Sequence, residues 1–159
     1  MIRIAVCDDE NVIVNQIEHI ISEVCKRESI PVNIDVFYSG RELKRQVTSG
    51  TKYDIIFLDI QMSGITGIEF AHNISKRTLV IFTTAYTEYA LDSYEVDAID
   101  YLIKPVDPER FHKAVNKAIA YHSLLLKEEK ENIEAGNTEY FFVKSERRYF
   151  KINYKDILF

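Results

Sequence analysis

Acidic, hydroxyl and ammonium side chains follow short apolar runs at several points of this sequence. Asp8 and Asp9 follow the run IRIAVC, and Asp59 follows DIIFL. Thr84 comes after LVIFT, and Lys104 comes after IDYLI. Three carboxylates that lie close together repel one another, which raises their pKa values or requires a cation. The chemistry open to these side chains therefore depends on whether the fold brings them together.

Together, these side chains would suit the transfer of a phosphoryl group to a carboxylate. Asp59 is the candidate nucleophile, because a carboxylate can form an acyl phosphate. Lys104 would contact the phosphoryl oxygens, and Thr84 would donate a hydroxyl hydrogen bond. We expect Mg²⁺ as the cofactor, because this ion prefers one or two carboxylates together with waters and phosphate oxygens. The predicted metal ligands are three carboxylates and one backbone carbonyl, from Asp8, Asp9, Asp59 and Gln61.

Apolar strand patterns and amphipathic helix patterns alternate along the first 126 residues. The predicted strands are 2–7, 32–37, 54–58, 79–83 and 99–103. The predicted helices are 11–27, 40–47, 67–76, 88–96 and 108–130. Strict alternation favours a parallel sheet with right-handed crossovers and helices on both faces. Because ligands bind beyond the carboxyl ends of such strands, we expect the polar residues at the strand ends to converge on one edge of the sheet.

The residues at the strand ends also match the pattern of a known family. The matching positions are Asp8-Asp9, Asp59, Thr84-Ala85 and Lys104-Pro105. This pattern resembles the receiver domains of two-component response regulators, and the resemblance covers residues 1–126. It implies an α/β, flavodoxin-like (βα)5 fold, in which a five-stranded parallel sheet of order 2-1-3-4-5 carries helices on both faces. It also implies that a histidine kinase phosphorylates Asp59, and that Asp8 and Asp9 bind Mg²⁺ with it.

The resemblance further implies a conformational switch. The family has a threonine and an aromatic residue at its switch positions, which match Thr84 and Tyr101 here. Thr83 competes for the hydroxyl role, because neighbouring strand residues face opposite sides of a sheet, and family spacing favours Thr84. Tyr101 fits half-buried packing as well as a switch, and both interpretations stay open. The family also implies a cis peptide bond between Lys104 and Pro105.

A narrower resemblance concerns the second half of the chain. The run at 85–105 resembles receivers attached to LytTR-type DNA-binding domains. The tail favours two β segments around a polar turn at 145–148, similar to the opening of a LytTR domain. The expected division is a receiver domain at 1–126, a linker or helix extension at 127–139, and at 140–159 either the incomplete start of a LytTR-like domain or a terminal β-hairpin. DNA binding and transcription regulation would then require the output domain of the full-length protein.

Two other functions have sequence arguments against them. A phosphatase with an aspartyl nucleophile on a related α/β fold typically needs a second acid two residues after the nucleophile, where this chain has Gln61. A flavin-binding domain would need a phosphate loop rich in glycine and hydroxyl groups after the first strand, where Asp8, Asp9 and Glu10 would repel a phosphate. We therefore expect a phosphoacceptor that promotes only its own phosphorylation and dephosphorylation, rather than an enzyme.

Composition and charge restrict the partners and the compartment. The formal net charge is −5 and the sequence pI is about 5.4, which argues against direct DNA binding by residues 1–130. Cys7 and Cys25 fall at distant ends of neighbouring elements, so we expect two reduced thiols. The N-terminus shows no signal-peptide or membrane-span pattern, which favours a cytoplasmic protein without a membrane partner.

The remaining candidates are histidines and tyrosines. The four histidines show no ligand-like clustering and are interpreted as surface residues: His19, His72, His112 and His122. The predicted fourth helix and fifth strand are rich in aromatic residues, which occur often at interaction hot spots. We expect homodimerisation on phosphorylation through this region, which holds Tyr86, Tyr89, Tyr94, Ile99 and Tyr101.

Overall fold

The computed structural model describes residues 1–62, 64–75, 77–85, 97–134, 140–145 and 148–153. The predicted fourth helix at 88–96, with Tyr86, Tyr89 and Tyr94 of the expected dimer region, lies outside the described residues.

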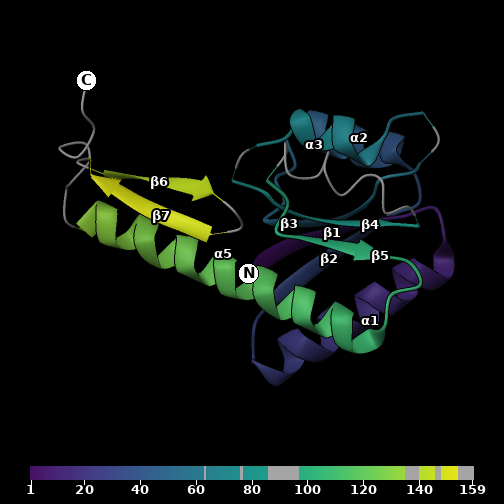
Figure 1. Cartoon of the computed structure of the whole chain (residues 1–159), viewed down its shortest axis with the longest axis horizontal. Helices are drawn as coiled ribbons and strands as arrows, with labels where there is room; N and C mark the ends of the chain where they lie inside the picture. Colours follow the sequence, from purple (N-terminus) through teal and green to yellow (C-terminus); the bar gives the residue numbers. More distant parts are fainter. Residues whose placement is uncertain (63, 76, 86–96, 135–139, 146–147, 154–159) are drawn as a thin grey trace.

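A parallel sheet forms the centre of the fold (Figure 1). Its strands are β1 (Ile2–Cys7), β2 (Val32–Phe37), β3 (Ile55–Asp59), β4 (Leu79–Thr84) and β5 (Asp100–Ile103). All neighbouring strands are parallel, and their order is β2-β1-β3-β4-β5. The predicted fold class and strand order are confirmed.

Helices cover both faces of the sheet, because its central strands are apolar on both sides. The described helices are α1 (Asn11–Arg27), α2 (Gly40–Thr48), α3 (Gly67–His72) and α5 (Pro108–Glu134). One core cluster joins the sheet to α1 and α5, and a second cluster joins it to α2 and α3. Alternation along β1 divides its side chains between the two clusters, with Ile4 and Val6 in the first and Ala5 and Cys7 in the second.

The third helix is shorter than predicted. It ends at His72 rather than at residue 76. Asn73 explains the early end, because its side-chain amide donates to the carbonyl of Glu69 at 2.9 Å and its N–H donates to the carbonyl of Phe70 at 3.0 Å. These bonds satisfy two carbonyls that further helical turns would otherwise use. The start of the helix is as predicted, with a complete capping box between Thr66 and Glu69.

The last helix begins within the receiver-like part and continues beyond it. α5 continues without a break to Glu134, beyond the predicted end at residue 130, and Figure 1 shows it extending past the sheet. β6 (Tyr140–Ser145) and β7 (Arg148–Asn153) pair in antiparallel fashion, as the two predicted β segments require. The proposed division into domains stays a prediction.

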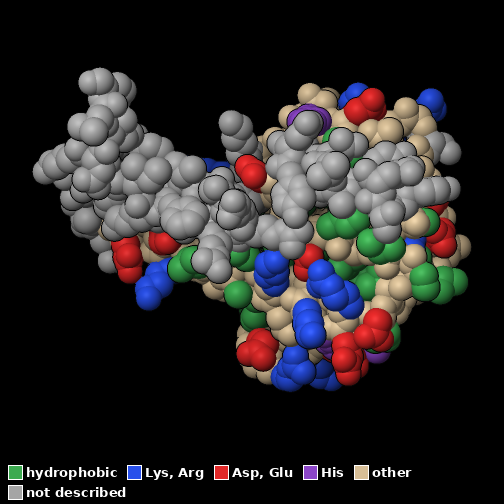
Figure 2. Space-filling model, viewed as in Figure 1, with side chains coloured by type: hydrophobic (Ala, Val, Ile, Leu, Met, Phe, Trp, Pro, Cys, Tyr) green, Lys and Arg blue, Asp and Glu red, His purple; other side chains and the backbone are tan. Residues whose placement is uncertain are grey.

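The surface of the described residues mixes both signs of charge on the face viewed in Figure 2. Lysine and arginine side chains lie next to aspartate and glutamate side chains over the lower part of the molecule in this view. No helix in the described ranges combines the length and apolarity that crossing a bilayer demands.

Candidate functional site

The polar residues that end the strands meet at one edge of the sheet. Cys7 pairs with Leu58, so Asp8 and Asp59 lie side by side at the ends of β1 and β3. Lys104 Nζ lies 2.8 Å from Asp8 Oδ2 and 3.3 Å from Asp59 Oδ2. The Lys104-Pro105 bond that follows β5 is cis, as predicted. The structure thus brings together two carboxylates and one ammonium group that are distant in the sequence. Asp8 and Lys104 are 96 positions apart.

Backbone hydrogen bonds orient both buried carboxylates. Asp8 and Asp59 are 0% and 3% exposed. The N–H of Glu10 donates to Asp8 Oδ1 at 2.9 Å, and the N–H of Gln61 donates to Asp59 Oδ1 at 3.1 Å. Each carboxylate is therefore held by the backbone two residues further along, and its second oxygen faces Lys104. The predicted metal contact of the Gln61 carbonyl is not tested by these bonds and stays a prediction.

Gly67, which the sequence analysis did not single out, lets the start of α3 lie close to the backbone of Asp59. The N–H of Gly67 donates to the carbonyl of Ile60 at 2.9 Å. A Cβ atom on Gly67 would lie 2.5 Å from the carbonyl oxygen of Asp59, closer than real Cβ contacts come. Only glycine fits at this point without moving the end of β3.

The two threonines at the end of β4 are both buried. The carbonyl of Thr84 accepts the N–H of Lys104 at 2.7 Å, which fixes the backbone of Lys104 beside β4. Thr83 is paired in register with Asp59, and its hydroxyl is buried without a hydrogen-bond partner among the described residues. The proposed hydroxyl role of Thr84 stays a prediction. Tyr101 is half-buried and packs against the core cluster beside α2 and α3, and its switch role also stays a prediction.

Burial is the largest cause that raises the pKa values of Asp59 and Asp8. Burial, followed by the charge of Asp8, raises the pKa of Asp59 to about 6. Burial also raises the pKa of Asp8, although Lys104 opposes the shift. Burial alone would lower the pKa of Lys104, but its hydrogen bonds to Asp8 and Glu10 produce a net upward shift. One ammonium group therefore leaves the negative charge of this site only partly compensated.

The donor set fits a small hard cation. Asp8, Asp9 and Glu10 each offer a carboxylate oxygen, and these oxygens lie within 4.8 Å of one another. Asp9 and Glu10 are exposed, so water can complete a coordination sphere on that side. Carboxylate oxygens and water are the ligands that Mg²⁺ takes in proteins. The uncompensated charge and the type of the donor atoms both fit the predicted ion.

Comparison with known proteins assigns the chain to a family. The model of the response regulator receiver domain matches residues 4–116. The chain belongs to the response regulator receiver domain family. This result confirms the resemblance that the strand-end residues carried.

Individual relatives of the receiver agree with the narrower resemblance. Sensory transduction protein LytT of Bacillus anthracis is 35% identical over 120 residues, which cover 74% of this chain and 47% of the relative. A response regulatory protein of Vibrio vulnificus is 49% identical over 78 residues, which cover 46% of this chain and 32% of the relative. The chain thus spans about half the length, or less, of these curated relatives. The predicted kind of receiver, that of LytT-type regulators, is confirmed.

A solved structure shows the same fold. The response regulatory domain of protein mrkE from Klebsiella pneumoniae superimposes with a TM-score of 0.69 at 23% sequence identity. The match covers 77% of this chain and 99% of that domain. At this identity, the likeness supports the fold of the receiver alone.

The cysteines of the receiver lie on opposite faces of the sheet. Cys7 belongs to the cluster beside α2 and α3, and Cys25 belongs to the cluster beside α1 and α5. Both are buried free thiols, as predicted. Burial, with Asp8 as the next cause, raises the pKa of Cys7 to about 12. Cys7 therefore remains protonated and unreactive beside the acidic site.

One histidine of the receiver is not the surface residue that was predicted. His122 is 8% exposed, and its Nε2 lies 3.4 Å from Asp54 Oδ1, just before β3. Its place on the apolar face of α5, with Phe111 and Ile119, is the sequence signal that indicates burial. His19 is exposed and His112 is half-buried, and both approach the carboxylate of Glu23, at 3.4 and 3.7 Å.

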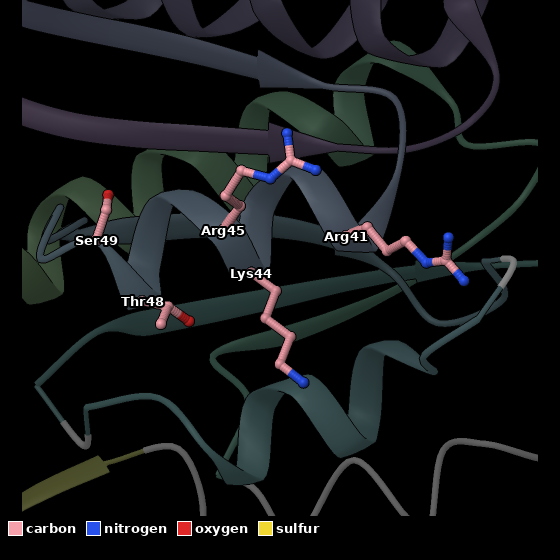
Figure 3. A pocket seen from close by; sticks show the side chains of 5 residues that line it. All are labelled: Arg41, Lys44, Arg45, Thr48 and Ser49. Carbon is pink, nitrogen blue, oxygen red and sulfur yellow. The ribbon is translucent and has the colours of Figure 1, made fainter.

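A basic hollow on the surface of α2 does not form an anion-binding site. It is lined by Arg41, Lys44, Arg45, Thr48 and Ser49. Figure 3 shows Arg45 and Ser49 on one side of the helix, Lys44 and Thr48 on the other, and Arg41 pointing away at its end. Because these side chains diverge, they do not converge on one ligand.

Proposed function

We propose that this receiver accepts a phosphoryl group from a histidine kinase on the carboxylate of Asp59 and thereby acts as the input of a two-component response regulator. The observation that carries the proposal is the position of Asp59. The side chain of Asp59 is 5% exposed and lies at the end of the central strand β3, where Oδ2 faces Lys104 Nζ at 3.3 Å next to Asp8. Such an arrangement holds a nucleophile beside an ammonium group that can stabilise the negative charge of the transferred phosphoryl group.

Each residue of the site has its own role in the phosphoryl transfer. An oxygen of Asp59 attacks phosphorus, the bond from phosphorus to the kinase histidine breaks, and the imidazole keeps the electron pair. The ammonium of Lys104 then contacts the phosphoryl oxygens, and the hydroxyl of Thr84 donates to them. Mg²⁺, when bound, neutralises charge on the transferring group. Its proposed ligands are Asp8, Asp9, Asp59 and the carbonyl of Gln61.

We further propose that phosphorylation acts through the surface beside β5. Thr84 and Tyr101 reposition, and the changed surface favours a homodimer. In the full-length protein, an output domain of the LytTR type would bind DNA and regulate transcription. The match to LytT and the β6–β7 pair support this proposal. The domain acts on no separate substrate, and a cytoplasmic location stays a prediction.

The acceptor assignment is tested by labelling with acetyl phosphate and Mg²⁺. We expect one phosphoryl group per chain by intact mass, and none on the Asp59→Asn variant. Asp97→Asn is the matched control, because Asp97 is exposed with a φ of 54°, which asparagine also adopts readily. Continued labelling of Asp59→Asn would contradict the assignment of Asp59 as the acceptor. Repeated turnover of small phosphate esters would support a phosphatase instead.

The metal assignment is tested separately with Asp9→Asn. Asp9 is exposed, so its substitution should leave the fold intact. Loss of one carboxylate ligand should weaken Mg²⁺ binding by about tenfold or more, since even outer partners of metal ligands have effects of this size. Titration followed by amide chemical shifts measures the affinity, again with Asp97→Asn as the control. An unchanged affinity would contradict the role of Asp9.

A further inference from the structure

The ammonium group of Lys104 has a third carboxylate partner, outside the predicted site. Glu10 Oε1 accepts a hydrogen bond from Lys104 Nζ at 3.0 Å, between the distances to Asp8 at 2.8 Å and Asp59 at 3.3 Å. The side chain of Lys104 is 10% exposed and that of Glu10 is 59% exposed. Glu10 therefore covers the ammonium group from the solvent side, whereas Asp8 and Asp59 contact it from within.

The backbone of Glu10 places its side chain at this position. Glu10 is the N-cap residue of α1, with an extended backbone at φ −94° and ψ 110°. Its N–H donates to Asp8 Oδ1, and its carbonyl accepts the N–H of Val14 at 3.1 Å. The side chain makes no capping hydrogen bond to α1, although this is the usual role of a polar side chain at an N-cap. It reaches Lys104 instead.

Three carboxylates crowd the ammonium group of Lys104, which donates hydrogen bonds to Glu10 and Asp59 and forms an ion pair with Asp8. An ammonium group carries three N–H bonds, and three carboxylates lie within 3.3 Å of it. A phosphoryl group on Asp59 presents new oxygens, so Lys104 must give up one partner to reach them. The exposed carboxylate of Glu10 is the partner that water replaces most readily.

We propose that Glu10 restrains Lys104 in the unphosphorylated receiver and thereby slows the acceptance of a phosphoryl group. The inference rests on the proposed function of Asp59. With acetyl phosphate, an oxygen of Asp59 bonds to phosphorus, the bond from phosphorus to the acetate oxygen breaks, and acetate leaves with the electron pair. Lys104 exchanges Glu10 for a phosphoryl oxygen during this step, so Glu10 is a positioning residue.

The test measures the rate of labelling by acetyl phosphate at saturating Mg²⁺, where a changed metal affinity has no effect on the rate. Glu10→Gln should be labelled about 2- to 5-fold faster than the wild type, the range expected for a partly exposed ion pair. Glu18→Gln is the control, because it also changes the formal net charge from −5 to −4 but lies on α1 away from Lys104.

A second variant separates the restraint from simple repulsion of an anionic donor. Glu10→Asp keeps the negative charge but is shorter by one methylene and does not reach Lys104. The restraint predicts that Glu10→Asp is accelerated as Glu10→Gln is, whereas repulsion predicts the wild-type rate. A wild-type rate for Glu10→Asp would therefore overturn the inference, as would a wild-type rate for Glu10→Gln or an equal acceleration in Glu18→Gln.

A readout without metal or phosphate follows Lys104 directly. In Mg²⁺-free protein, the ammonium protons of Lys104 are observed by ¹H–¹⁵N NMR. We expect their exchange with water to be faster in Glu10→Gln and Glu10→Asp than in the wild type, and unchanged exchange would overturn the inference. Labelling of Asp59→Asn would instead contradict the proposed function, so the two failures are distinguishable.

Discussion

The raised pKa of Asp59 links the stability of the receiver to pH. In the unfolded chain this carboxyl titrates near 3.8, and in the folded protein it titrates near 6. Between these values, the folded state binds a proton that the unfolded state has released. The stabilisation from this proton is present at lower pH and is lost as the pH rises through about 6. At neutral pH, the ionised Asp59 therefore destabilises the metal-free protein.

Asp59→Asn should for this reason make the metal-free protein more stable at pH 7. We expect the free energy of unfolding in urea to rise by about 1–3 kcal/mol, the order of magnitude of a shift of about two pKa units. The gain should shrink as the pH falls to 4, where Asp59 in the wild type becomes protonated. A gain of the same size at both pH values would contradict the titration of Asp59 as its cause.

At the scale of residues, the site was predictable where strand order decides position. Asp8 and Lys104 each follow a strand, Asp59 ends one, and a parallel sheet brings the ends of its strands to one edge. The contact of Glu10 with Lys104 joins residues 94 positions apart, and the sequence does not indicate where an exposed glutamate side chain points. The position of His122 on the apolar face of α5 indicated that its side chain is buried. The prediction placed it at the surface because histidine is a polar residue type.

At the scale of elements, the loop from β3 to α3 depends on a close backbone approach. We expect Gly67→Ala to lower the free energy of unfolding by about 1–3 kcal/mol, because its Cβ would collide with the carbonyl of Asp59. Displacement of Asp59 should also slow labelling by acetyl phosphate. Urea unfolding and the labelling rate measure the two effects.

Gly50 provides the matched comparison for Gly67. It follows α2 with a φ of +103°, and nothing lies within 4 Å of its missing Cβ. Gly50→Ala should therefore destabilise the protein through its backbone conformation, by about 1 kcal/mol, and leave the labelling rate unchanged. An equal loss of labelling in both variants would show that stability alone, rather than the position of Asp59, explains the effect of Gly67→Ala.

The order of the elements was more predictable than their ends. Hydrophobic periodicity gave α1 and the first two strands with their observed bounds. The predicted end of α3 was wrong because Asn73 can either continue a helix or bond to its last carbonyls, and the sequence does not indicate which of the two occurs.

At the scale of the whole molecule, phosphorylation should change the oligomeric state. We expect the protein labelled with acetyl phosphate to form a dimer, measured by light scattering during size-exclusion chromatography. Asp59→Asn, treated in the same way, should keep the mass of the unlabelled protein. An equal fraction of dimer in both samples would show that dimerisation does not depend on phosphorylation of Asp59.

The unbroken length of α5 has a mechanical consequence. The helix begins four residues after Lys104 and contains 27 residues, which corresponds to a rod of about 40 Å. Its first half is clamped in the core by Phe111 and Val115, and the His122–Asp54 contact lies near its middle. A tilt of about 5° about this fulcrum moves the two ends by about 2 Å each in opposite directions. A rigid helix that pivots there would convert a small displacement at its first turn, close after Lys104, into an equal and opposite one at its far end.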